Sequence, residues 1–260
     1  MSEFKLINVH TEDRIGLVTL SHPPANTLSQ KMIQELETAF DRFSEDANVK
    51  VILLHGEGRF FAAGADIKEF TSVKHGDQFR EMSREGQRVF RKIELMTKPV
   101  IAAIHGAALG GGLELAMACH IRLAAPDAKL GLPELQLGLV PGFAGTQRLP
   151  ELVGKAKATE MLLTSDPITG EEAMAAGLVN RTLPGENFMD QAKKFAENIS
   201  NKGSHSVSYV LELIEKSGNE PIERGQEIEA VRFGDVSETY DASEGIKAFM
   251  EKRKPKFEDR

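Results

Sequence analysis

Two short continuous apolar runs, at residues 51–54 and 100–104, most constrain how this 260-residue chain can fold. Runs of this length without polar alternation are typical of strands buried on both faces of a parallel sheet. A charged helical segment at about 77–96 separates them, and a helical pattern at 110–119 leads to another strand-like run at 121–124. Strands that alternate with helices at this spacing predict βαβ units, and therefore an α/β fold.

The two ends of the chain differ in their patterns. Near the start, a strand is predicted at 15–20, and Thr27 and Gln30 have the spacing of a capping box before a helix. One apolar face of that helix consists of Met32, Leu36, Ala39, Phe40 and Phe43. After about residue 170, no strand longer than 178–183 is predicted, and a helical stripe follows from Phe188 to Ile199. We expect an α/β core at 1–195 and a helical C-terminal part at 196–260.

Composition excludes several classes of protein. The formal net charge of −7 argues against a general nucleic-acid binder, which usually has a basic excess. No apolar run approaches the roughly 20 residues that span a bilayer, and residues 1–20 do not have the basic and apolar regions of a signal peptide. Cys119 is the one cysteine and lies in an apolar stretch, which predicts an inert buried thiol without a disulfide. We expect a soluble protein of a reducing compartment, the cytoplasm.

Two glutamates lie in apolar surroundings, twenty positions apart. Glu114 follows a glycine triplet at 110–112, and Glu134 lies within the run Gly-Leu-Pro-Glu-Leu at 131–135. Desolvation among Leu, Ala and Pro raises the pKa of a carboxyl group toward the range useful for proton transfer. The pair is therefore a candidate for acid/base chemistry at neutral pH. The alternative is two ordinary surface glutamates, since most glutamates are exposed.

Two glycine-rich segments suggest backbone binding of a ligand. The triplet at 110–112 opens a predicted helix, although glycine costs about 1 kcal/mol against alanine in a helix interior. A second small-residue loop lies at 60–67. One N–H group from each loop could hold a single carbonyl oxygen, which is the arrangement of an oxyanion hole. The alternative for each loop is a tight turn without a ligand.

Other site types are weak or absent in the sequence. There is no Gly-x-Gly-x-x-Gly after a strand, no Walker-type motif and no Gly-x-Ser-x-Gly elbow. No pair of histidines has the spacing of zinc ligands, and His105 and His120 flank strand-like runs, which predicts structural roles for both. Tryptophan is absent, so a stacking platform for bases is not indicated.

Several segments in order carry a resemblance to a known family. They are 61–68 (Phe-Ala-Ala-Gly-Ala-Asp-Ile-Lys), 104–116 with its glycine triplet, 131–134 with 138–148, and the tail at 248–255. On these motifs the chain resembles the crotonase (enoyl-CoA hydratase/isomerase) superfamily along nearly its whole length. The resemblance implies a crotonase-like ββα superhelix core.

The resemblance also implies a reaction. The N–H groups of Ala65 and Gly111 would bind a thioester oxygen, Glu114 would deprotonate a water that adds to C3, and Glu134 would deliver a proton to C2. Retention of both glutamates favours an enoyl-CoA hydratase of the fatty acid β-oxidation type, which acts on 2-trans-enoyl-CoA and needs no metal or redox cofactor. The alternatives are an enoyl-CoA isomerase, a hydratase of a branched or aromatic acyl-CoA and, more remotely, an RNA-binding relative.

Substrate contacts and assembly follow from the same resemblance. The residues that it assigns to coenzyme A or substrate are Ala25, Ala63, Asp66, Ile67, Lys68, Phe233 and Lys252. The length of the acyl pocket is expected to depend on Phe70, Val73, Phe79 and Phe90. The family usually forms homotrimers or homohexamers (dimers of trimers), which gives the helical region at 196–260 an expected role in oligomerisation. Nucleic acid and membrane are not expected partners.

Overall fold

The main sheet confirms the predicted alternation of strands and helices. The computed structural model describes residues 4–260, and in this part of the chain a six-stranded sheet has the order β1-β2-β3-β5-β7-β10. Its strands are β1 (Ile7–Glu12), β2 (Ile15–Leu20), β3 (Val51–Gly56), β5 (Val100–Ile104), β7 (Ile121–Ala124) and β10 (Arg181–Thr182). Apart from the antiparallel β1–β2 pair, neighbouring strands are parallel. Both apolar runs that define the fold class are therefore interior strands.

A second, smaller sheet was not predicted. Within residues 4–260 it has four strands in the order β4-β6-β8-β9. They are β4 (Phe60–Ala62), β6 (Ala107–Leu109), β8 (Lys129–Gly131) and β9 (Ile168–Thr169). Each has two or three residues, too few for a period-2 pattern to be recognised. The predicted strand at 178–183 was too long, because strand β10 comprises Arg181–Thr182 alone.

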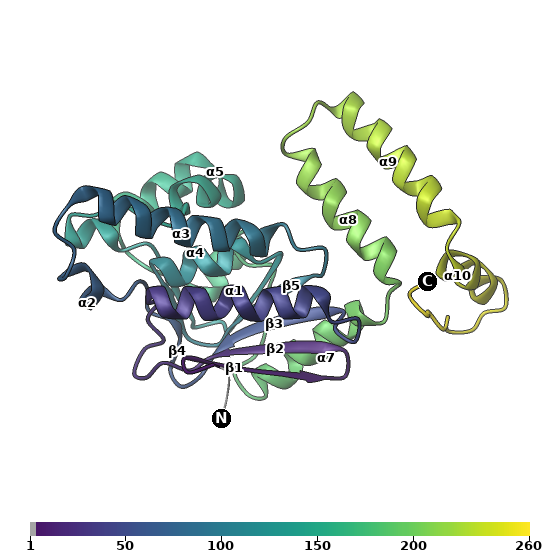
Figure 1. The fold of residues 1–260 in the computed structure, drawn as a ribbon, viewed down its shortest axis with the longest axis horizontal. Helices are drawn as coiled ribbons and strands as arrows, with labels where there is room; N and C mark the ends of the chain where they lie inside the picture. The colour runs from purple at the N-terminus through teal and green to yellow at the C-terminus, as the bar shows by residue number, and fades with distance from the viewer. Residues whose placement is uncertain (1–3) are drawn as a thin grey trace.

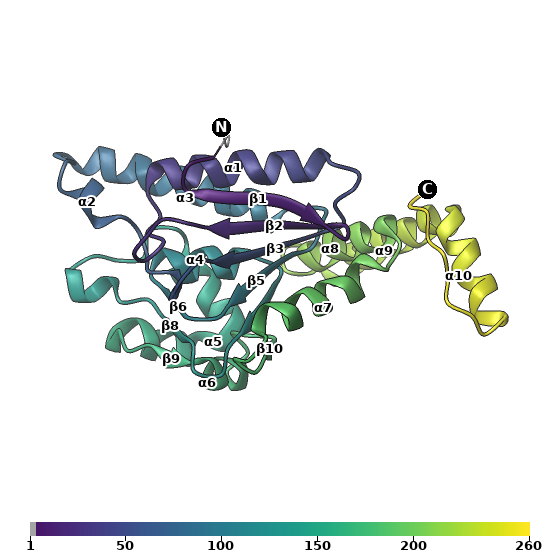
Figure 2. The ribbon, with the colours of Figure 1, turned by 90° about the horizontal axis from the view of Figure 1, so that it is seen from below.

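Helices cover both sides of the main sheet. Helices α1 (Gln30–Glu45) and α3 (Gly76–Glu94) lie on one side, and α7 (Phe188–Ser200) contacts β2, β3 and β5 (Figures 1 and 2). The predicted apolar face of α1 is buried as expected. The predicted cap was wrong by two residues, because Ser29 is the N-cap and its Oγ accepts a hydrogen bond from the N–H of Met32 at 3.1 Å.

Helix α4 (Gly111–Ala118) is buried along its entire length. It contacts α3, α5 (Gly145–Thr164), β4 and β6. A Cβ atom at Gly112 would lie 2.2 Å from the carbonyl oxygen of Ala62, so the helix approaches β4 more closely than any side chain permits. The glycine triplet thus places the start of α4 against the end of β4.

The C-terminal helices stand apart from the core. Helices α8 (Ser204–Ser217), α9 (Ile222–Ser237) and α10 (Tyr240–Met250) extend away from the sheets (Figure 1). The predicted boundary at 195 falls inside α7. The division of the chain into 1–195 and 196–260 stays a prediction, and residues 1–3 lie outside the described part. No helix in residues 4–260 combines the length and apolarity that crossing a bilayer requires.

Candidate active site

The four residues predicted to act on the substrate line one cavity. This cavity has a volume of about 440 Å³, and Ala65, Gly111, Glu114 and Glu134 all contribute to its wall. They come from the β4–α2 loop, the start of α4 and the 3-10 helix η1 (Glu134–Leu137). Much of the remaining wall is apolar and includes Ile67, Phe70, Phe79, Met82, Leu137 and Val140. An apolar cavity with a few convergent polar groups is typical of a small-molecule site.

The amides of Ala65 and Gly111 lie close together. A Cβ atom at Gly111 would lie 3.4 Å from the nitrogen of Ala65, and one at Gly64 would lie 3.8 Å from the nitrogen of Gly111. Gly64 and Gly110 have φ of 107° and 51°, conformations that glycine adopts without strain. Gly111 begins α4, so its N–H group has no acceptor within the helix and lies at the positive end of the helix dipole. The two amides can therefore serve one anionic oxygen.

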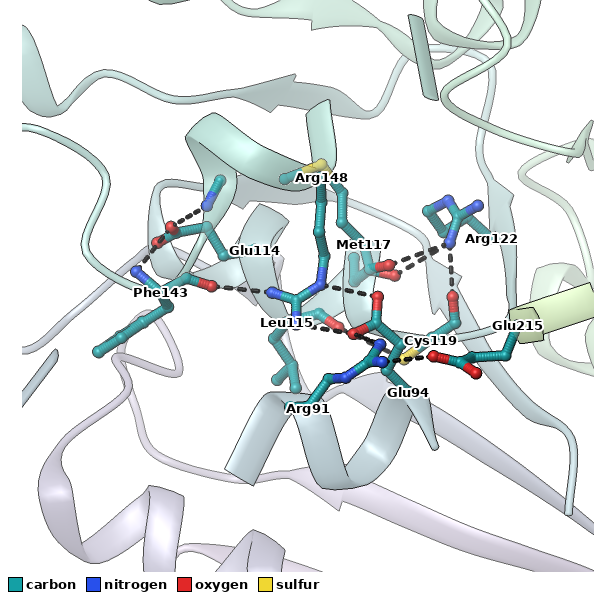
Figure 3. Close-up of polar contacts among 12 residues, drawn as sticks. Arg91, Glu94, Glu114, Leu115, Met117, Cys119, Arg122, Phe143, Arg148 and Glu215 are labelled. Atoms are coloured by element: carbon teal, nitrogen blue, oxygen red, sulfur yellow. Dashed lines mark hydrogen bonds and ion pairs between the residues drawn. The ribbon is translucent and has the colours of Figure 1, made fainter. Parts of the chain in front are cut away.

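Glu114 is held from outside its own helix. Its side chain is buried, and its Oε1 accepts hydrogen bonds from the N–H groups of Phe143 at 2.8 Å and Gly145 at 2.7 Å (Figure 3). Burial raises the pKa of Glu114 to about 7, the negative charge of Glu134 adds to this rise, and the two backbone donors oppose it. Because both donors engage Oε1, the other oxygen is the one that can take a proton.

Glu134 has the opposite environment. It lies on η1, and within residues 4–260 its buried Oε2 has no hydrogen-bond partner. A Cβ atom at Gly110 would lie 2.8 Å from its Oε1, so the glycine triplet also makes room for this carboxyl group. Burial raises the pKa of Glu134. A buried carboxyl oxygen without a donor favours the neutral form of the group, which can deliver a proton.

The far end of α4 is closed by a buried arginine. Arg122 donates from Nη1 to the carbonyl oxygen of Cys119 at 2.5 Å and, at 3.5 Å, to those of Ala116 and Met117 (Figure 3). A positive charge at the C-terminus of a helix offsets the negative end of its dipole. Cys119 is a free and buried thiol, as the sequence predicted, and burial raises its pKa to about 12.

Both histidines singled out in the sequence have structural partners. His105 Nε2 lies 2.7 Å from the carbonyl oxygen of Gly58, and His120 Nδ1 accepts from the N–H of Val100 at 2.9 Å. Burial lowers the pKa of His120 to about 4. The predicted structural roles are thus confirmed. In the described part of the chain, no three His, Cys, Asp or Glu side chains form a group that could hold a metal ion.

The residues expected near coenzyme A divide into two groups. Ala63 and Ile67 line the cavity, and the carbonyl oxygen of Ala25 accepts from the N–H of Ala63 at 3.0 Å. Asp66 caps helix α2 (Ile67–Phe70) by accepting from the N–H of Lys68 at 3.1 Å, and the Lys68 side chain is exposed. Of this first group, Ala63 and Ile67 line the cavity itself, and Ala25, Asp66 and Lys68 lie next to them in the structure.

The second group lies elsewhere. Phe233 on α9 is 74% exposed, and Lys252 follows α10, so both belong to the C-terminal region that extends away from the sheets of their own chain (Figure 1). Their contact with a ligand bound to a neighbouring chain stays a prediction. Among the residues expected to set pocket length, Phe70 and Phe79 line the cavity, whereas Phe90 is fully buried and packs edge-on against Phe143.

Sequence reasoning missed the segment that holds Glu114. Phe143 and Gly145 are 29 and 31 positions further along the chain, and no local pattern relates them to α4. A Cβ atom at Gly145 would lie 2.9 Å from Glu114 Oε1, so a side chain here would push against the carboxyl group that the loop holds. It belongs to the family-like block at 138–148, which was the one signal available in the sequence.

Known proteins of one family match nearly the whole chain. The family model described as enoyl-CoA hydratase/isomerase matches residues 10–260. The chain is 50% identical over 252 residues to a probable enoyl-CoA hydratase of Bacillus subtilis, covering 96% of this chain and 98% of the relative. It is 41% identical over 256 residues to a crotonyl-CoA hydratase of Syntrophomonas wolfei, covering 98% of both.

A solved structure gives the same result. The crystal structure of an enoyl-CoA hydratase from Bacillus anthracis superposes with a TM-score of 0.93 at 36% identity, covering 98% of this chain and all of the other. The predicted crotonase-like core with a helical C-terminal part is therefore confirmed. The chain belongs to the enoyl-CoA hydratase/isomerase family.

Proposed function

We propose that this protein is an enoyl-CoA hydratase, a hydro-lyase that adds water reversibly across the double bond of 2-trans-enoyl-CoA to give 3-hydroxyacyl-CoA. One observation carries the proposal most directly. Two carboxyl groups, one held by two N–H donors and one with a buried oxygen that has no donor, line the same apolar cavity as two paired amides. The names of the Bacillus subtilis and Syntrophomonas wolfei relatives support the same activity.

The geometry gives each group a role in the reaction. The thioester oxygen would accept from the N–H groups of Ala65 and Gly111, which stabilise the enolate-like charge that develops on it. Ionised Glu114 would take a proton from a water molecule through Oε2 as the hydroxyl oxygen bonds to C3. Neutral Glu134 would give its proton to C2. A proton that passes from Glu114 to Glu134, directly or through solvent, restores the starting state.

The wider assignment has two further parts. Coenzyme A enters as part of the substrate, and a reaction without a metal or redox cofactor stays a prediction. A cytoplasmic location likewise stays a prediction, supported by the single cysteine.

Assembly into homotrimers or homohexamers through the C-terminal helices forms part of the proposal. Helices α8 to α10 expose large apolar side chains, and such surfaces commonly mark protein interfaces. These side chains are Val210, Ile214, Ile222, Val231, Phe233, Ile246, Phe249 and Met250. Light scattering tests this part, since the chain mass is 28.5 kDa. A monomeric mass at micromolar concentration would count against it.

The activity is tested with crotonyl-CoA and a matched 3-enoyl thioester. A hydratase consumes the conjugated double bond and yields a product heavier by one water, whereas an isomerase moves the double bond without taking up water. Glu114→Gln and Glu134→Gln should each lower the hydration rate by about 1000-fold. Glu45→Gln is the control, because Glu45 is exposed at the end of α1. Full activity of either cavity variant would contradict the assigned roles.

A further inference from the structure

The loop that holds Glu114 has a conformation that needs external support. Its middle residue, Ala144, has φ of 74°, a left-handed conformation that is unfavourable for residues other than glycine. Its flanking residues, Phe143 and Gly145, provide the two N–H groups that reach Glu114. Whatever fixes this loop therefore also fixes the position of the Glu114 carboxyl group.

Arg148 is the charged side chain that binds this loop from outside the cavity. Its Nη1 donates to the carbonyl oxygen of Phe143 at 2.9 Å (Figure 3), between the two N–H groups that hold Glu114. Arg148 is 8% exposed and does not line the cavity of about 440 Å³. Its contact with the reacting groups therefore passes through the backbone of the loop.

Arg148 is itself held in a fixed orientation. Its Nε and Nη2 donate to the two oxygens of Glu94 at 3.0 and 3.1 Å. Glu94 is the last residue of α3, and its Oε2 also accepts from Arg91 at 2.8 Å. Arg91 in turn donates to Glu215 on α8 at 2.5 Å. Figure 3 shows this connected set of contacts between the loop and the C-terminal helices.

A simple structural role for Arg148 would be to join α3 to α5. The Arg148–Glu94 pair alone is sufficient for that role, and it uses Nε and Nη2. The remaining Nη1 extends to the loop, so one planar guanidinium serves both partners in a fixed relative geometry. Lysine, with a single ammonium group, cannot reproduce this arrangement.

We propose that Arg148, oriented by Glu94, is a positioning residue for the hydration reaction: it fixes the 143–145 loop so that two backbone N–H groups stay on Glu114 Oε1. This inference depends on the proposed function for its kinetic consequences. Its structural consequence, the state of the Glu114 carboxyl group, can be measured without any substrate.

The proposal predicts a change in the titration of Glu114. The charged groups that act on it are Glu134 from η1 and Arg148 from α5, and Glu94 of α3 lies beyond Arg148. The loop donors and the positive charge of Arg148 both lower the pKa of Glu114 against the effect of burial. Removing Arg148 takes away its positive charge and weakens the hydrogen bonds from the two loop N–H groups, so the pKa of Glu114 should rise.

The test compares Arg148→Met, Arg148→Lys and Glu94→Gln with the wild type. For crotonyl-CoA hydration, Arg148→Met should lower kcat about 100-fold, since small misplacement of a catalytic group has effects of this size. KM should change little, because Arg148 does not line the cavity. The acid limb of the kcat profile should move up by about one pH unit. Arg148→Lys and Glu94→Gln should show smaller changes in the same direction, and they remain informative should Arg148→Met fold poorly.

Two comparisons separate positioning from simple stability. Arg148→Met should add little loss in a Glu114→Gln background, since both substitutions affect the same step. Arg88→Gln is the matched control, because Arg88 makes a bidentate pair from α3 to Glu37 at 2.5 and 2.6 Å away from the loop. The control should leave kcat and its pH profile unchanged.

The carboxyl group of Glu114 is also titrated directly by carbon-13 NMR on labelled glutamate, with Glu114→Gln identifying the signal. A raised pKa of Glu114 in Arg148→Met supports the proposal even where the wild type does not hydrate crotonyl-CoA. Lack of hydration would contradict the proposed function and leave the positioning role standing. An unchanged Glu114 titration together with an unchanged kcat profile, while the melting temperature falls, would overturn the positioning role.

Discussion

The two carboxyl groups of the cavity show how one residue type acquires two properties. Glu114 lies in a fully buried helix and receives two N–H donors from a distant loop. Glu134 lies on a short 3-10 turn, and in residues 4–260 its inner oxygen has no donor. Burial raises the pKa of both, but Glu114 receives its opposing donors from a distant loop, whereas the donor that opposes the rise at Glu134 is its own backbone N–H.

This difference indicates which group acts as the base. Donors that hold one oxygen of Glu114 stabilise the carboxylate and leave the second oxygen for a proton. The solitary Oε2 of Glu134 suits a neutral acid that gives its proton away. The structure therefore gives the two carboxyl groups of one cavity different hydrogen-bond partners, and each prediction below tests that asymmetry.

The largest difference is expected from shortening each side chain by one methylene. Glu114→Asp cannot keep both loop donors and still reach the substrate water, so hydration should fall about 1000-fold. Glu134 lies on a surface turn that can adjust to a shorter side chain, so Glu134→Asp should lower the hydration rate by about 100-fold. Steady-state rates with crotonyl-CoA provide the measurement. A larger loss in Glu134→Asp would reverse the comparison.

The next effect concerns stability and pH. The folded-state pKa of Glu114 is raised from 4.5 to about 7, so its contribution to stability is fully present below pH 4.5 and is lost as the pH rises through 7. The shift corresponds to about 3 kcal/mol in the free energy of unfolding. Urea unfolding at pH 5 and pH 8 should show this loss in the wild type.

The same measurement on Glu114→Gln isolates the contribution of this group. That variant should not show the loss, although titration of other residues affects both proteins equally. Equal pH dependence in the two proteins would mean that Glu114 is not the buried group responsible.

A methyl group at Gly145 should disturb one carboxyl group without touching the other. The added Cβ would lie 2.9 Å from Glu114 Oε1, so Gly145→Ala should lower kcat by about 30-fold through misplacement of that group. Gly76→Ala is the matched control. Both glycines begin a helix, and nothing lies within 4 Å of a Cβ atom at Gly76. Equal rates for both variants would show that the loop tolerates the added methyl.

The last effect, about tenfold for each pH unit, is the pH dependence of the wild-type rate. Because the base must be ionised, kcat/KM should fall about tenfold per pH unit below about pH 7, the pKa of Glu114. Because the acid must be neutral, a second limb should follow the pKa of Glu134, which burial raises. Rates measured from pH 5 to pH 9 check both limbs. A profile without an acid limb would argue against Glu114 as the base.

Much of the fold could be predicted because its strongest signals are local. Continuous apolar runs identified β3 and β5, and the helical stripe identified α7. The smaller sheet could not be predicted, because strands of two or three residues have no periodicity of their own. They form only where neighbouring strands are already in place.

The sequence by itself determined that two desolvated glutamates and two glycine-rich loops belong to this chain, since these features depend on composition within a few positions. Tertiary structure alone decided that they share one cavity, that Phe143 and Gly145 bind Glu114, and that Glu134 Oε2 stays without a partner. Hydrogen-bond partners 29 and 31 positions apart are set by the packing of α3, α4 and α5, which no local pattern encodes.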